Sequence, residues 1–177
     1  MELSDRHRHF LWVEQAAIPA VFNLLINGAI AWLLFRSITT VPLWGESSSG
    51  VDLLITGFLL PFLTCLIVSA LVRRQVASGA LPPLPTGQLP LSGWFRRSVP
   101  ARGAALGVAG MLFGAAPVVL ALDLAGAPAI AAGSFVAYKA IGAAALALLV
   151  TPFVGWWALA SASEARAAAP LPQASGP

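Results

Sequence analysis

Charged side chains are scarce in this chain of 177 residues, at 10% of the total against 58% hydrophobic residues. An ordinary soluble domain carries about a quarter charged residues. A water-soluble fold with so little charge could not cover its surface, whereas helices that face lipid need no such cover. The mean hydropathy is high, at +0.83. The scarcity of charge therefore excludes a conventional soluble domain and indicates an integral membrane protein.

Cysteine and histidine are nearly absent. The chain has one cysteine, Cys65, and two histidines, His7 and His9, which precede the first apolar run. A single cysteine excludes an intramolecular disulfide and a cysteine-rich metal site. The sequence also has no HExxH motif and no glycine-rich phosphate loop after a strand. We therefore expect no catalytic residue, cofactor or metal, which weighs against an enzyme; His7 and His9 should be solvated and Cys65 an inert buried thiol.

Long apolar runs are what the chain has instead. Each approaches or exceeds the ~20 residues that a helix needs to cross the ~30 Å hydrocarbon core of a bilayer. The four runs are 10–35, 52–72, 103–124 and 134–160. We predict an all-α fold, a bundle of four transmembrane helices that forms one domain over residues 1–163. A proline-rich, semi-extended connection over 75–101 joins the second and third runs, and residues 164–177 should form a disordered tail.

Basic residues are divided unevenly between the two sets of loops. Eight of the nine arginines lie in the set that contains both termini and the 75–101 connection. The other set has Arg36, with Lys139, the one lysine, just inside the fourth run. Because Lys/Arg asymmetry sets orientation, we predict that both termini are cytoplasmic. The excess of arginine over lysine suggests a bacterial, GC-rich source and so the bacterial inner membrane; topology explains the basic charge without a nucleic-acid partner.

Polar residues within the first run are candidate functional residues. Asn23 and Asn27 are four residues apart, so they share one helical face near mid-membrane. They could form interhelical hydrogen bonds or line a polar path. Glu14 lies one turn inside the same run, on the opposite side of the helix from Asn23. It could exchange protons at an inner gate or form an ion pair. The candidate partners for that ion pair are Arg73, Arg74 and Arg102.

A second group of charged residues gathers near the predicted outer ends of the runs. Asp52 opens the second run, Asp123 ends the third, and Lys139 lies about one turn inside the fourth. Ionisable groups are costly within a bilayer, so a pair between Lys139 and either carboxylate would remove most of the cost. The group is either a structural ion pair or the mouth of a vestibule that binds an ion or an anionic head group.

Prolines and glycines within the runs predict where the helices bend and where they approach one another. Each run has one proline, which removes a backbone donor and either kinks the helix or hinges it beside a hydrated path. These prolines are Pro19, Pro61, Pro117 and Pro152. The third run also carries glycines three or four residues apart, at Gly103, Gly107, Gly110 and Gly114. Such spacing lets helix backbones approach closely, so we expect the last two runs to pack as a hairpin, and a homo-oligomer could form through the same glycines.

These features favour a small multi-pass membrane protein for transport or permeation of an ion or small solute. The alternative is an accessory or scaffold protein that transports nothing and docks a protein partner through the 75–101 connection. That connection ends in Trp94-Phe95-Arg96-Arg97, aromatic and cationic side chains suited to anionic lipid. The lipid bilayer is the partner that the composition itself requires.

Overall fold

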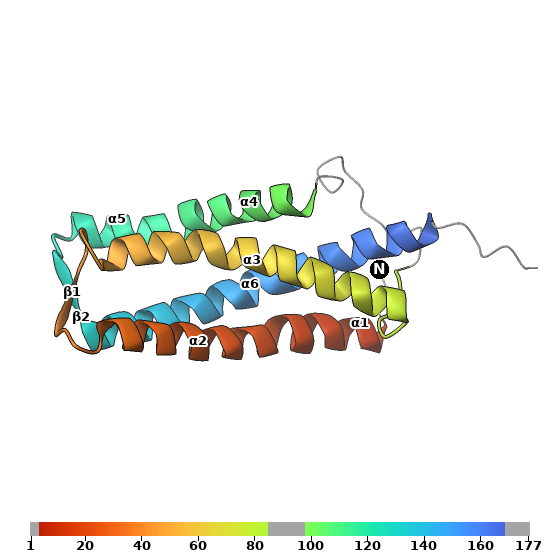
Figure 1. The fold of residues 1–177 in the computed structure, drawn as a ribbon, viewed down its shortest axis with the longest axis horizontal. Coiled ribbons are helices and arrows are strands. Elements are labelled where there is room, and N and C mark those ends of the chain that lie inside the picture. The colour runs from red at the N-terminus through yellow and green to blue at the C-terminus, as the bar shows by residue number, and fades with distance from the viewer. Residues whose placement is uncertain (1–3, 85–97, 169–177) are drawn as a thin grey trace, which may run out of the picture.

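Four long helical segments lie side by side in the computed structural model, which describes residues 4–84 and 98–168 (Figure 1). Within these residues, all four are long and apolar enough to cross a membrane. The segments are Asp5–Phe35 (α1 Asp5–His9, π-helical η1 Phe10–Ala17, α2 Ile18–Phe35), α3 Ser49–Ser78, Val99–Leu124 (α4 Val99–Ala109, π-helical η4 Gly110–Ala115, α5 Ala116–Leu124) and α6 Ala132–Ala167. The prediction of an all-α protein with four apolar helices is therefore confirmed.

The helices extend beyond the apolar runs that predict them. The second run was expected to end at residue 72, but α3 continues for six further residues, through Arg73 and Arg74. It ends at Gly79, whose φ of 79° is the left-handed conformation that commonly closes a helix. Hydropathy marks the part of a helix suited to lipid, whereas the hydrogen-bonded helix itself continues into the polar ends.

Two of the four segments contain a π-helical stretch that ends two residues before a proline. These are η1, before Pro19, and η4, before Pro117. The backbone N–H after each stretch bonds to the carbonyl five residues back. A proline ring clashes with the carbonyl four residues before it, and a wider turn gives that carbonyl room. Pro61 and Pro152 lie instead within the continuous α-helices α3 and α6.

The two central helices are α3 and α6, which pack on each other. The first segment packs along α6, and the third packs along α3 (Figure 1). The order across the bundle is therefore first, fourth, second, third. The prediction that the last two runs form a packed hairpin is wrong, because the small-residue face of the third segment turns toward α3.

A short β-ribbon joins the two loops at one end of the bundle, which we call the strand end. β1 (Thr40–Pro42) pairs antiparallel with β2 (Ala129–Ala131), with Val41 opposite Ile130. Val41 is fully buried, and Phe35 and Phe135 pack edge to face beneath the ribbon with ring centroids 5.1 Å apart. Because β1 lies between the first and second segments and β2 between the third and fourth, the ribbon ties the two loops of this end together.

The opposite end, which we call the arginine end, contains the start of the 75–101 connection. This part is packed instead of extended. Leu81 and Leu84 are buried, and the Leu84 N–H donates to Ser163 Oγ at 2.9 Å. His7, predicted to be solvated, is 6% exposed and forms a 2.9 Å hydrogen bond with the Pro82 carbonyl oxygen. The predicted lipid contact of residues 94–97 and the predicted disorder of residues 169–177 lie outside the described residues. The first residues of the predicted tail are helical, because α6 continues to Ala167.

Candidate functional site

A buried ion pair joins the two central helices near the strand end. Lys139 Nζ of α6 lies 2.6 Å from Oδ1 and from Oδ2 of Asp52 on α3. The Lys139 side chain is 4% exposed and that of Asp52 is 20% exposed. Lys139 is seven residues from the start of α6 at Ala132, which places it about 10 Å along the helix. Burial reduces solvent screening, so the two charges interact more strongly than a surface pair.

The packing of α3 and α6 explains why space remains beside this pair. Toward the arginine end the two helices share a tight core, in which Cys65 and Val68 of α3 pack with Val154 of α6. Toward the strand end they lie apart (Figure 1). A cavity of about 230 Å³ opens between them, and Gly114 of η4 forms part of its third wall.

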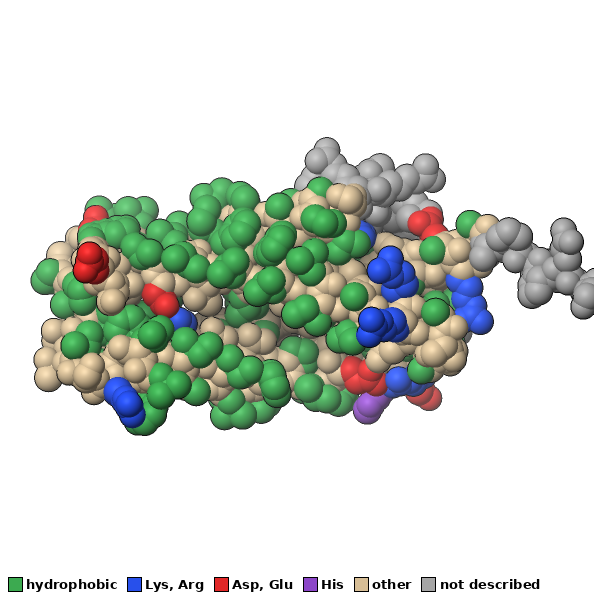
Figure 2. Space-filling model, viewed as in Figure 1, with side chains coloured by type: hydrophobic (Ala, Val, Ile, Leu, Met, Phe, Trp, Pro, Cys, Tyr) green, Lys and Arg blue, Asp and Glu red, His purple; other side chains and the backbone are tan. Residues whose placement is uncertain are grey.

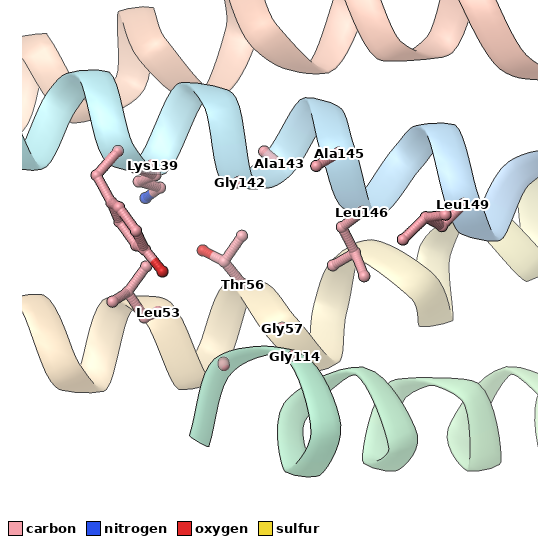
Figure 3. Close-up of a pocket in the computed structure, with 12 residues that line it drawn as sticks. Leu53, Thr56, Gly57, Gly114, Lys139, Gly142, Ala143, Ala145, Leu146 and Leu149 are labelled. Carbon is pink, nitrogen blue, oxygen red and sulfur yellow. The ribbon is translucent and has the colours of Figure 1, made fainter. Parts of the chain in front are cut away.

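The cavity is polar at one end and apolar along its length. Lys139 and Thr56 point into the same space from α6 and α3 (Figure 3). Tyr138, the one tyrosine of the chain, also lines the cavity. Leu146 and Leu149 follow further along α6 (Figure 3). An arrangement of charged and hydroxyl groups beside a hydrocarbon wall suits a small amphiphilic molecule.

Asn23 and Asn27 share a face of α2 but bond to their own helix. Asn23 Nδ2 donates to the Pro19 carbonyl oxygen at 2.9 Å. Asn27 Nδ2 donates to the carbonyl oxygen and to Oδ1 of Asn23, at 3.1 and 3.2 Å. Both side chains are partly buried, and neither lines the cavity beside Lys139. The structure therefore does not bring the asparagine pair together with the ion pair.

The other charged candidates have separate partners. Asp123 Oδ1 accepts a 2.9 Å hydrogen bond from Trp44 Nε1, so Asp123 is not part of the Lys139 pair. Glu14 forms an ion pair with Arg6 of α1. The predicted partners of Glu14 belong to other helices, whereas α1 continues directly into η1 and presents Arg6 on the same segment. No group of three or more candidate metal ligands occurs among the described residues.

Three glycines of the third segment lie against the backbone of α3. A Cβ added to Gly103, Gly107 or Gly110 would lie 3.2, 2.8 or 2.5 Å from a backbone carbonyl oxygen of α3. Gly114 meets nothing within 4 Å of an added Cβ and borders the cavity instead. The glycine row therefore serves packing within this chain over most of its length.

Sequence reasoning missed four polar residues, two that line the cavity and two that are buried in the bundle. Thr56 and Tyr138 line the cavity, and Tyr138 could have been noticed as the neighbour of Lys139. Gln15 and Thr151 are 8% and 2% exposed, and within the described chain their side-chain oxygens have no hydrogen-bond partner. Gln15 packs against Gly155, where an added Cβ would lie 2.7 Å from Gln15 Cγ. A lone threonine in an apolar run gives no sequence signal, because a helix can bond its hydroxyl locally.

Comparison with known proteins adds no relative: no family model, no curated protein and no solved structure matches the chain. The functional assignment therefore depends on the geometry of the site.

Proposed function

We propose that this four-helix protein transports a small amphiphilic solute or an ion across a membrane, and that the solute binds in the cavity beside Asp52 and Lys139. The observation that carries the proposal is a buried ion pair whose Lys139 lines a cavity between the two central helices. Ionisable groups within membrane spans are costly and commonly belong to substrate or proton pathways. A pair that served packing alone would need no open volume beside it.

The chemistry of the pair suits exchange with a bound molecule. Lys139 supplies N–H donors, Asp52 supplies acceptor oxygens, and Thr56 supplies a hydroxyl that can do either. A solute with a donor, an acceptor and a short apolar body could replace part of the Lys139–Asp52 contact while Leu146 covers its apolar part.

The outer segments supply a means of movement. Each contains a π-helical stretch before its proline, and π-helical turns occur frequently at functional sites. Both η1 and η4 contact a central helix, α6 and α3 respectively. A change of register within these turns would tilt each outer segment against the central pair, which is the kind of motion that alternating access requires.

Two observations favour the alternative, an accessory protein that transports nothing. The core between α3 and α6 is filled toward the arginine end, and the asparagine amides are satisfied within α2. A static bundle of this kind would act by docking a partner, for which the 75–101 connection remains the proposed segment.

Flux measurements in proteoliposomes separate the two functions. Purified protein would be tested by osmotic swelling in short-chain amino acids and amines, and with an enclosed pH-sensitive dye for protons. We expect flux above that of protein-free vesicles, lowered at least about tenfold by Asp52→Asn, since the loss of one buried charge–charge contact exceeds 1.4 kcal/mol.

Asp123→Asn is the matched control, because it removes another carboxylate of the strand end, one that bonds to Trp44 and lies outside the cavity. It should leave the flux unchanged. Wild-type flux equal to that of protein-free vesicles for every probe would refute transport and favour the accessory role.

A further inference from the structure

A second cavity, of about 360 Å³, lies at the arginine end, where α3, α4 and α6 meet. Figure 2 shows most of the visible Lys and Arg side chains gathered, with some Asp and Glu, at the end of the molecule that contains α1, while hydrophobic side chains are spread over the face between the two ends. The cavity is lined by Arg73 and Arg102 and by the hydroxyl side chains of Ser69 and Ser161, and none of its lining residues is acidic.

Arg102 is held in place within this cavity. It is 6% exposed, and its Nη1 donates to Ser161 Oγ of α6 at 3.2 Å. Its guanidinium carbon lies 4.6 Å from the centroid of the Trp157 ring, a cation–π distance. A planar guanidinium that is fixed before binding loses little conformational entropy when it engages a ligand.

Backbone and neighbouring side chains add to the positive potential. Ser69 and Arg73 are four residues apart on α3, so they lie on one face. Val99 and Pro100, the first two residues of α4, form another wall, and the Ser98 side chain makes no capping hydrogen bond there. The N-terminus of a helix favours an anion.

We propose that this cavity binds a phosphate group, and that its source is an anionic phospholipid. Arginine binds phosphate oxygens through paired, charge-assisted hydrogen bonds, and two arginines with two hydroxyls can donate to the free oxygens of a phosphodiester. The lining of the cavity also changes from polar at the arginines to apolar further along α3. Leu66 lies seven residues before Arg73 on α3, about 10 Å along the helix axis, and lines its apolar end. A lipid would place its head group at the arginines and an acyl chain against Leu66, whereas a free phosphate would use the polar end alone.

This site is independent of the proposed transport site. Asp52 and Arg73 are 21 residues apart on the continuous helix α3, which corresponds to about 30 Å. The two cavities share no lining residue. Failure of the transport proposal would therefore leave this one intact, and the reverse also holds.

Native mass spectrometry of the detergent-purified full chain tests the site, with phosphatidylglycerol and phosphatidylcholine titrated separately. Glycerol 3-phosphate serves as the soluble competitor.

We expect phosphatidylglycerol to be retained in preference to phosphatidylcholine, and Arg73→Gln to weaken the binding of phosphatidylglycerol about tenfold. Arg74→Gln is the matched control: it removes the same charge from the next exposed residue of α3, outside the cavity. It should change the affinity less than about twofold, as for a screened surface charge. Asp52→Asn should leave lipid retention unchanged.

Each outcome decides between binding at this cavity and general surface charge. Equal weakening by Arg73→Gln and Arg74→Gln, or equal retention of both lipids by the wild type, would overturn the site. Displacement of phosphatidylglycerol by millimolar glycerol 3-phosphate would support the phosphate site and overturn the lipid as its source. Arg102→Lys keeps the charge but loses the paired hydrogen bonds, so a folded variant that binds as tightly as the wild type would also overturn the proposal.

Discussion

Gly110 of η4 lies so close to Gly57 of α3 that a Cβ added to Gly110 would be 2.5 Å from the Gly57 carbonyl oxygen. Three residues earlier, a Cβ on Gly107 would lie 2.8 Å from the carbonyl oxygen of Phe58. A carbonyl within a helix cannot turn away as a flexible side chain can. The third segment therefore packs on α3 through positions where a side chain would force the backbones apart.

Replacing Gly107 or Gly110 with alanine should destabilise the bundle. The added methyl group would force apart two helices that are in backbone contact, at a cost of about 1–3 kcal/mol, the usual range for overpacking. Gly114→Ala is the matched control on the same segment, since nothing lies within 4 Å of its Cβ. It should be neutral or stabilising by up to about 1 kcal/mol through helix propensity. Thermal unfolding in one detergent compares the three variants, and equal effects at Gly107 and Gly114 would contradict this packing.

The number and type of helices follow from the sequence because lipid imposes a simple requirement on composition and length. Which helices touch is a different matter. The glycine row predicts a face for close approach, and the structure places most of that face in a close contact. However, spacing does not name the partner helix, and proximity in sequence suggested α6 where the structure has α3.

In the candidate site too, the sequence predicts which residues take part but not which of them are partners. Lys139 could be expected to pair with either Asp52 or Asp123, because all three lie at one level of the predicted bundle. The structure pairs Lys139 with Asp52, while a hydrogen bond from Trp44 holds Asp123. Asp52 and Lys139 meet because α3 packs on α6, and no local pattern in the sequence predicts which helices are neighbours.

Breaking the Lys139–Asp52 pair should cost stability, and removing both charges should restore most of it. Lys139→Met leaves the Asp52 carboxylate without its partner, and we expect a loss of about 3–5 kcal/mol, typical of a broken buried pair. The double variant Lys139→Met/Asp52→Leu leaves no buried charge. Its stability should approach that of the wild type, with a coupling free energy of at least about 1 kcal/mol in a double-mutant cycle. Additive effects of the two substitutions would mean that the side chains do not interact.

The order of helices across the bundle can be tested with engineered disulfides. A Cβ on Gly28 of α2 would lie 3.2 Å from Ala140 Cβ of α6, close to the ~3.5–4.5 Å of a disulfide. In a Cys65→Ser background, Gly28→Cys/Ala140→Cys should therefore cross-link on mild oxidation, seen as a mobility shift that a reductant reverses. Gly28→Cys/Ile55→Cys, which joins the sequence neighbours α2 and α3, should not. Cross-linking of that second pair alone would support an order in which consecutive helices are neighbours.

Cys65 offers a test of topology because it is the one cysteine and is 1% exposed. In intact spheroplasts and in lysed cells it should resist a membrane-impermeant maleimide, and react only after denaturation. Against that background, Glu46→Cys reports the strand end and Ser78→Cys the arginine end, both at exposed positions. Since arginine gathers with the termini, we predict that Glu46→Cys is labelled in intact spheroplasts and Ser78→Cys only after lysis. The reverse pattern would invert the orientation, and labelling of both before lysis would rule out a bundle that crosses the bilayer.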